Sequence, residues 1–458
     1  MNKNIKLAVA GAVLALSATA ANAGIVIPAG DWTLDVSGNV NMYTTWAKAK
    51  GGATIEGGAV GLPQAGGNHG TQNSFSNGLL PNFLSFSGTT RQNDLDVSFT
   101  ISLQPGSTAY NALNGGTGGV GGMNTGNGGI NNRQAFITFG DKSWGSVKVG
   151  KDLGIFASDA ILSDMTLLGV GAPVAGGAGG NYGGNTTLGR IGYGYMYADW
   201  KPQIAYTTPN FNGFQATVGI SQAFASNSYA QAGSHSTGYF SAATSSTTLA
   251  NSGKNANVAY EGKASYSFAA NDVTGKVWVS GLAQHVGQMT ATNSTVYTYG
   301  LASSVPLASS STLGNNDPMA YVGDIGVNVN FAGFGLTGYY YSGSGIGITG
   351  QMNNGYGIGS SGNAVARDSD GGYVQATYTL PTKTKIGLSW GQSNLDRAGD
   401  EIADSNLIKS NEMWVGMVTH PLTKHLNLVA EYSHSRSENQ ASQRNTTDAG
   451  SLGAILFF

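Results

Sequence analysis

Cysteine is absent from this sequence, and charged residues make up only 10% of it, against about 25% in ordinary soluble domains. The absence of thiols excludes disulfide bonds, a cysteine nucleophile and a cysteine metal site. After the N-terminal region, no apolar stretch approaches the roughly 20 residues that a membrane-spanning helix needs. The formal net charge is −2, so the chain has no basic excess for binding nucleic acid, and we expect no nucleic-acid partner.

Residues 1–23 have the organisation of a secretory signal peptide. Lys3 and Lys6 precede an apolar core at residues 7–16, and small residues at 21–23 form a cleavage site. Such segments are removed from the mature protein. We therefore expect residues 24–458 to form one mature domain.

The clearest structural signal is alternation of apolar and polar residues in residues 321–341. Ile325, Val327 and Val329 alternate with Asp324, Gly326 and Asn328, and a tight turn at residues 332–333 joins a second alternating run. Because successive strand residues point to opposite faces, the pattern predicts a hairpin with one apolar and one polar face. A soluble sandwich would bury the apolar face against a second sheet, whereas a membrane barrel would turn it to lipid.

The same alternation recurs along the chain and predicts sixteen strands. They cover residues 32–42, 82–89, 94–103, 133–140, 144–150, 200–208, 213–221, 258–268, 273–284, 321–331, 334–341, 372–380, 384–390, 411–419, 426–433 and 450–458. Connections alternate strictly between short turns and long Gly-, Ser- and Asn-rich loops, as in outer-membrane barrels. The prediction is an all-β fold, a transmembrane antiparallel β-barrel of 16 strands, rather than a sandwich.

Charged residues of the strands fall on the polar face, where a barrel has its water-filled lumen. The predicted lumen-facing set is Asp35, Asp94, Asp96, Lys148, Lys201, Glu261, Lys263, Lys276, Asp324, Lys385, Glu412 and Glu431. A Lys or Arg turned to lipid near the midplane would cost about 2–4 kcal/mol. For most of these residues we expect no role beyond a solvated wall.

Residues 152–199 interrupt the strand pattern and form the third long loop. The segment is rich in apolar residues, and Ser158 and Asp159 resemble the start of a helix over residues 160–168. We expect the loop to fold into the lumen, to bury its apolar residues on the wall and to constrict the pore. A lid over the outer mouth and a trimer-contact loop are the alternatives.

The predicted pore constriction combines loop acids with wall charges. Its residues are Asp152, Asp159 and Asp164 from the loop, opposed by Arg91 and Lys148, with Asp94 and Asp96 nearby on the third strand. Opposed charges across a narrow wet passage set ion preference.

Several motifs together resemble one known family. They are NRQAFITFGDKSWGSVKVGKDLG at residues 131–154, the loop that follows, the strand and loop alternation, and LGAILFF at the C-terminus. The mature chain resembles the general, trimeric porins of Gram-negative bacteria over its whole length. The resemblance implies an outer-membrane channel for passive diffusion of ions and small hydrophilic solutes. It also implies a homotrimer, contact with outer-membrane lipid and assembly by the β-barrel assembly machinery, which reads an aromatic C-terminus.

The resemblance also implies site residues, with one departure. The family's loop acids correspond to Asp152, Asp159 and Asp164, whereas its arginine cluster is represented nearby only by Arg91 and Arg133. This departure from the family pattern implies a weak preference for cations. We expect no catalytic residue, no metal site and no cofactor. One alternative is a substrate-specific channel of the same fold. A weaker alternative is a barrel enzyme that uses His434 beside Ser433 and Ser435. A β-solenoid adhesin would show a fixed sequence repeat, and the sequence has none.

Overall fold

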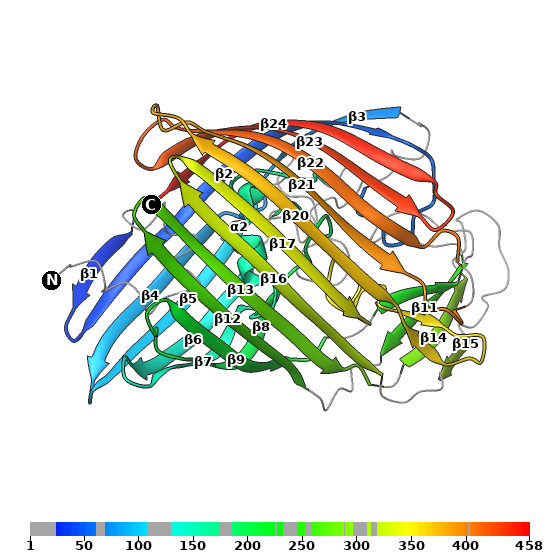
Figure 1. Cartoon of the computed structure of the whole chain (residues 1–458), viewed down its shortest axis with the longest axis horizontal. Helices are drawn as coiled ribbons and strands as arrows, with labels where there is room; N and C mark the ends of the chain where they lie inside the picture. Colours follow the sequence, from blue (N-terminus) through cyan, green and yellow to red (C-terminus); the bar gives the residue numbers. More distant parts are fainter. Residues whose placement is uncertain are drawn as a thin grey trace.

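The computed structural model describes residues 24–60, 69–107, 130–173, 186–224, 227–231, 245–251, 258–287, 289–295, 309–312, 318–401 and 404–458. Within these residues, sixteen strands follow one another around a single sheet (Figure 1). They are β2 (Trp32–Lys50), β4 (Phe83–Gln92), β5 (Leu95–Pro105), β6 (Ile130–Asp141), β7 (Gly145–Leu153), β8 (Trp200–Thr207), β9 (Phe214–Gln222), β12 (Val258–Ala270), β13 (Val273–His285), β16 (Met319–Phe331), β17 (Phe334–Ser344), β20 (Asp368–Thr379), β21 (Lys385–Asp396), β22 (Ile408–Pro421), β23 (Leu426–Asn439) and β24 (Arg444–Phe457).

The sheet closes on itself through β2. One edge of β2 pairs with β4 from Thr33 to Asn39, and the other edge pairs with the final strand β24 from Asn39 to Lys50. Every neighbouring pair around the ring is antiparallel. The predicted 16-stranded antiparallel barrel is confirmed.

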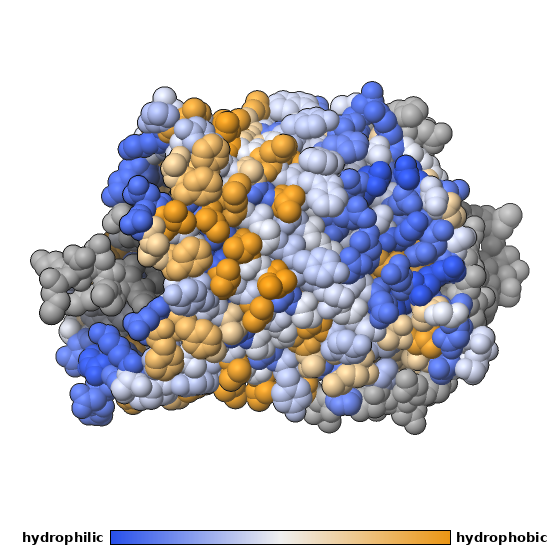
Figure 2. All heavy atoms as spheres, viewed as in Figure 1, coloured by the Kyte–Doolittle hydropathy of each residue, from blue (hydrophilic) through white to orange (hydrophobic). Residues whose placement is uncertain are grey.

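Side chains alternate between the two faces of the barrel wall as predicted for residues 321–341. On β16, Ile325 is 59% exposed on the outer face, whereas Asp324 is 7% exposed on the inner face. Exposed Val, Ile, Leu and aromatic residues from neighbouring strands extend this outer face into the apolar band of Figure 2. Exposed apolar residues in a continuous band are stable only against lipid, so the barrel spans a membrane. None of the described helices has the length and apolar character to cross a membrane by itself.

Short turns gather at one end of the barrel, and the terminal strand β24 also ends there (Figure 1). The turn between β4 and β5 has Asn93 and Asp94 at positive φ, and the turn between β16 and β17 has Ala332 and Gly333 there. Two adjacent residues at positive φ match the right-handed twist of a tight hairpin. The predicted alternation fails at the last long-loop position, because β23 and β24 are joined by residues 440–443 alone.

The inner face of β22 departs from the predicted polarity. Glu412, predicted to face the lumen, lies on the outer face with its carboxylate 2.5 Å from Arg436 Nη2 and accepting from Trp390 Nε1 at 2.9 Å. The inward positions are instead Met413 and Val415, which are fully buried. The reason is that a chain segment inside the barrel covers this part of the wall, so apolar residues face inward.

Smaller elements extend the ends of the barrel. β1 (Ile25–Ala29) pairs with the start of β2, and β3 (His69–Ser76) pairs with its end. At the long-loop end, β10 (Asn227–Gln231), β11 (Ser245–Asn251), β14 (Met289–Thr295) and β15 (Ser309–Thr312) form a four-stranded sheet. A separate hairpin consists of β18 (Tyr356–Ile358) and β19 (Ala364–Ala366). The predicted signal peptide, residues 1–23, lies outside the described residues.

A buried carboxyl pair joins two of the long connections. Glu56, between β2 and β3, is 5% exposed, and Asp404, between β21 and β22, is fully buried. The backbones of the same connections are joined where Ile408 N donates to Glu56 O at 2.9 Å. Burial and the adjacent Asp404 raise the pKa of Glu56 to about 9. Glu56 is therefore protonated at neutral pH, which removes repulsion between the two carboxyl groups.

This connection should weaken as the pH rises. The folded pKa of Glu56 lies above its ordinary value of 4.5, so its contribution is fully present below pH 4.5 and is lost as the pH rises through about 9. Hydrogen exchange at the Ile408 amide, corrected for intrinsic rate, should accelerate between pH 6 and pH 9. Glu56→Gln should stay protected across that range. A pH-independent wild type, or a variant that still responds to pH, would show that Glu56 does not control this contact.

Candidate pore constriction

A segment inside the barrel connects β7 to β8. This inner loop is described at residues 154–173 and 186–199 and begins and ends at a backbone hydrogen bond from Gly154 N to Asp199 O, 2.8 Å long. It contains α2 (Ser158–Ser163) and the 3-10 helix η2 (Met165–Leu168). The predicted single helix over residues 160–168 is split at Asp164, which has extended backbone and caps η2 by accepting from Thr166 N.

One wall carboxylate fixes the start of the inner loop. Glu261 on β12 accepts hydrogen bonds from the backbone amides of Ile155 and Phe156, both at 2.9 Å. It also accepts from Lys201 Nζ and Ser221 Oγ at 2.6 Å. A buried carboxylate is stable only when its oxygens are paired and hydrogen-bonded. The amides of the loop therefore replace water as hydrogen-bond donors to Glu261. This carboxylate fixes the chain where the loop enters the lumen.

A second wall carboxylate fixes the loop beyond η2. Glu431 on β23 accepts from Val170 N at 3.2 Å and from Gly171 N at 2.6 Å. Next to it, Ser433 Oγ donates to Gly171 O, and Tyr43 Oη on β2 donates to Leu168 O. Glu261 and Glu431 thus attach the inner loop to widely separated strands of the ring.

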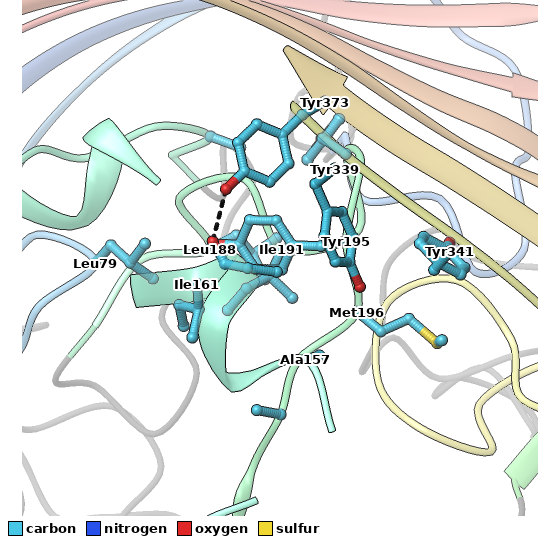
Figure 3. Close-up of a cluster of buried hydrophobic side chains, with 14 of the residues drawn as sticks. Leu79, Ala157, Ile161, Leu188, Ile191, Tyr195, Met196, Tyr339, Tyr341 and Tyr373 are labelled. Carbon is cyan, nitrogen blue, oxygen red and sulfur yellow. Dashed lines mark hydrogen bonds between the residues drawn. The ribbon is translucent and has the colours of Figure 1, made fainter. Parts of the chain in front are cut away.

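Between these attachments the loop packs on aromatic residues of the wall (Figure 3). Tyr195 of the loop lies beside Tyr373 of β20, with ring centroids 5.7 Å apart, and Tyr339 of β17 lies at the same distance from Tyr373. Tyr373 Oη donates to Ala160 O at 2.8 Å. Large buried rings with satisfied polar groups give the loop a single position against β17 and β20.

The three predicted loop acids lie in or against the inner loop, and each has a cationic partner. Asp152, on β7, is paired with Lys148 and accepts from Gln134 Nε2 at 3.0 Å. Asp159 is 2.9 Å from Lys263 Nζ and also pairs with Lys276. Asp164 is buried, accepts from Tyr195 Oη at 2.9 Å and lies 3.9 Å from Arg190 Nε. The structure therefore turns these carboxylates toward the wall or the loop interior.

Ionisation of Asp159 is ensured by its two lysines. Burial alone would raise the pKa of Asp159, but Lys263 and Lys276 hold it below its ordinary value. The lysine side chains are the more accessible members of this cluster, at 19% and 35% exposed against 8% for the aspartate side chain. The cluster therefore presents positive charge toward the lumen.

Within its described residues, the accessible part of the inner loop is mostly apolar. Ile155, Phe156, Ile161 and Met165 are buried as predicted. Leu162, Leu167 and Leu168 were also predicted to be buried, but they are only partly covered. In the described part of the loop, Leu162 and Leu167 therefore border open space, whereas Asp159 and Asp164 are buried.

The remaining predicted constriction residues lie elsewhere. Arg91, Asp94 and Asp96 flank the short turn between β4 and β5, at the opposite end of the strands from the long loops. Arg91 binds Asp96 at 2.8 Å and Asp141 of the next turn at 3.0 Å. Their placement in the constriction is corrected: these charges pair with one another across adjacent turns, away from the described part of the inner loop.

Sequence reasoning missed the roles of several residues. Glu261, Glu431, Lys263 and Lys276 were placed on the inner face, but nothing in the strand pattern indicated that they hold the loop. Arg190 was not singled out, although it is fully buried and donates to Met413 O at 3.2 Å. An arginine within an otherwise apolar and Gly-rich segment was the available signal, because a buried arginine needs acceptors.

A closed barrel with an apolar outer band, a polar inner face and an inward-folded loop defines an outer-membrane channel. The sequence profile described as Gram-negative porin matches residues 8–440. The chain belongs to this family, which places it in the outer membrane of a Gram-negative bacterium. A search of curated proteins finds no match.

Solved structures share the fold at low sequence identity. The outer membrane channel DcaP of Acinetobacter baumannii is 13% identical with a TM-score of 0.58, covering 95% of this chain and all of DcaP. An anion-selective porin from Comamonas acidovorans is 13% identical with a TM-score of 0.51, covering 93% of this chain and all of that porin. A loop-deleted OmpT of Vibrio cholerae is 11% identical at the same TM-score, with coverage of 93% and 100%. These similarities concern the fold alone.

Removing the second wall carboxylate should release the inner loop. Glu431→Leu deletes the acceptors of the Val170 and Gly171 amides, and hydrogen bonds to charged groups contribute about 1.5–3 kcal/mol. Amide exchange at both residues should accelerate by about tenfold or more. The control is Glu412→Leu on the adjacent strand, whose side chain faces outward. Equal exchange at Gly171 in wild type and Glu431→Leu would contradict the assigned role.

Proposed function

We propose that this protein is a passive diffusion channel for ions and small hydrophilic solutes. The observation that carries the proposal is the inner loop, residues 154–173 and 186–199, held by Glu261 and Glu431 inside a closed ring of strands. A sixteen-stranded ring leaves room for water in its lumen. A loop fixed to the wall narrows that space without the cost of an exposed backbone in lipid. The segment from 152 to 199 is the pore-constricting loop of this proposal.

We also propose the assembly that the family resemblance implies. Gram-negative porins are commonly trimers, and a homotrimer in outer-membrane lipid is the assembly we expect here. Recognition by the β-barrel assembly machinery belongs to the same proposal, and the outer face of β24, with Leu452 and Leu456, supports it.

The charges that remain accessible favour a different charge preference from the one expected. A cation preference required accessible carboxylates, but Asp152, Asp159 and Asp164 are paired and nearly inaccessible. Accessible charge at the loop comes from Lys263 and Lys276, and Lys385 adds a further inward cation on β21. We therefore propose a weak preference for anions in place of the cation preference.

A barrel enzyme has less support. Its one sequence candidate, His434, lies on the outer face with Nδ1 2.8 Å from Asp448 Oδ1. Ser433 and Ser435 are buried on the opposite face of the same strand. A nucleophile must lie within hydrogen-bond reach of its base, and this histidine and these serines are separated by the wall.

Planar bilayer recording tests both the channel and its charge preference. The purified protein should give stepwise conductance, with steps grouped in threes. In a KCl gradient the reversal potential should indicate preference for chloride, because Lys263 and Lys276 raise the local anion concentration. Lys276→Gln should move the reversal potential toward that of potassium, and Asp159→Asn should move it the other way.

Lys48→Gln is the matched control, since Lys48 lies on the outward face of β2 toward the long-loop end. It should leave the reversal potential unchanged. Electrically silent bilayers would contradict the channel itself. A chloride preference that is insensitive to Lys276→Gln would place the selective region elsewhere in the lumen.

A further inference from the structure

A cavity of about 480 Å³ lies between the inner loop and the wall formed by β6, β7 and β8. We call it the side vestibule. It is bounded by residues of the inner loop, by the segment before β4 and by the connection after β17. Its volume is that of a site for one small molecule, since ligand pockets measure about 300–1,000 Å³.

The walls of the side vestibule are mostly apolar. They include the side chains Leu79, Leu80, Ile161, Leu162, Leu167 and Ile191. Three aromatic side chains, Tyr197, Trp200 and Phe224, also line the cavity. A hydrated ion gains little from such walls, whereas the apolar body of an organic solute is stabilised by leaving water.

Polar groups with a positive excess lie among these walls. Arg133 and Lys151 line the side vestibule, and Asp199 is the acid among its lining residues. Arg133 occupies a bulge in β6, where the pairing with β5 shifts register between Ser102 and Leu103. A bulge re-aims a side chain at the end of a strand. Lys151 Nζ donates to Asn132 O at 2.9 Å, which leaves its charge without a carboxylate partner within the described residues.

The two cations and the aromatic walls of the side vestibule together define the complementary ligand.

We infer that the side vestibule binds an aromatic monocarboxylate. The carboxylate would be held by Arg133 and Lys151, and the ring would lie against Trp200 and the leucines of the inner loop. A guanidinium pairs with a carboxylate through two parallel hydrogen bonds. The inference rests on the proposed function in one respect: binding here would place such solutes beside the constriction and favour their passage at low concentration.

Calorimetric titration of the detergent-solubilised protein tests the site without requiring transport. The probes are sodium benzoate, sodium acetate, which has the charge without the ring, and benzyl alcohol, which has the ring without the charge. Benzoate should bind at least about tenfold more tightly than either comparator. Arg133→Gln should weaken benzoate binding by about tenfold, and Leu162→Ser should weaken it without affecting acetate.

Arg91→Gln is the matched control, because it removes the same group at the short-turn end of the barrel. It should leave the benzoate affinity unchanged. Acetate or benzyl alcohol binding as tightly as benzoate would overturn the inference. A protein that conducts ions but does not bind benzoate would overturn the site and leave the channel. Benzoate binding that responds to Arg133→Gln in a protein silent in bilayers would support the site and contradict the channel.

Discussion

The structure depends on one constraint, which is that lipid offers no hydrogen-bond partner to a peptide group. A sheet crossing a membrane must therefore have no free edge. In this protein β2 satisfies the constraint by pairing with β4 along one edge and with β24 along the other. Closure separates an outer surface, which meets lipid, from an inner space, which can hold water. Because side chains alternate along each strand, apolar residues face the lipid and polar residues face the inner space.

The inner loop adds a second requirement, because it brings backbone and charge into a confined space. Its amides need acceptors, and Glu261 and Glu431 supply them from opposite parts of the wall. Its acids need cations, and lysines of β12 and β13 and Arg190 supply those. The buried charges of this loop therefore hold the loop in place against the wall. In the cluster around Asp159, the two lysines are the more accessible charges.

Sequence alone predicted the barrel because its main signal is local. The alternation in residues 321–341 reports the two environments of a strand directly, and the tight turns are marked by residues that tolerate positive φ. The pattern fails where a third environment intervenes. Met413 and Val415 can face inward because the inner loop covers them. The alternation of polar and apolar residues on β22 therefore does not reveal that Glu412 faces outward.

The candidate site was less predictable because its contacts are distant in sequence. Asp159 contacts lysines more than a hundred residues further along the chain, and no spacing rule connects them. The extension of β23 and β24 beyond the apolar band was not predicted, for a related reason. The polar residues at the ends of β23 and β24 remain in strands by pairing with each other, so no long loop forms between them.

The most direct test asks whether the inner face of the barrel meets water and the outer face meets lipid. It uses the absence of cysteine from the chain. Single cysteines are introduced as Leu162→Cys, on the accessible edge of the inner loop, and Ile325→Cys, on the outer face. A charged, membrane-impermeant thiol reagent is then added during single-channel recording. We expect a stepwise fall in conductance for Leu162→Cys and no change for Ile325→Cys. Modification of Ile325→Cys with loss of current, together with an unreactive Leu162→Cys, would contradict this expectation.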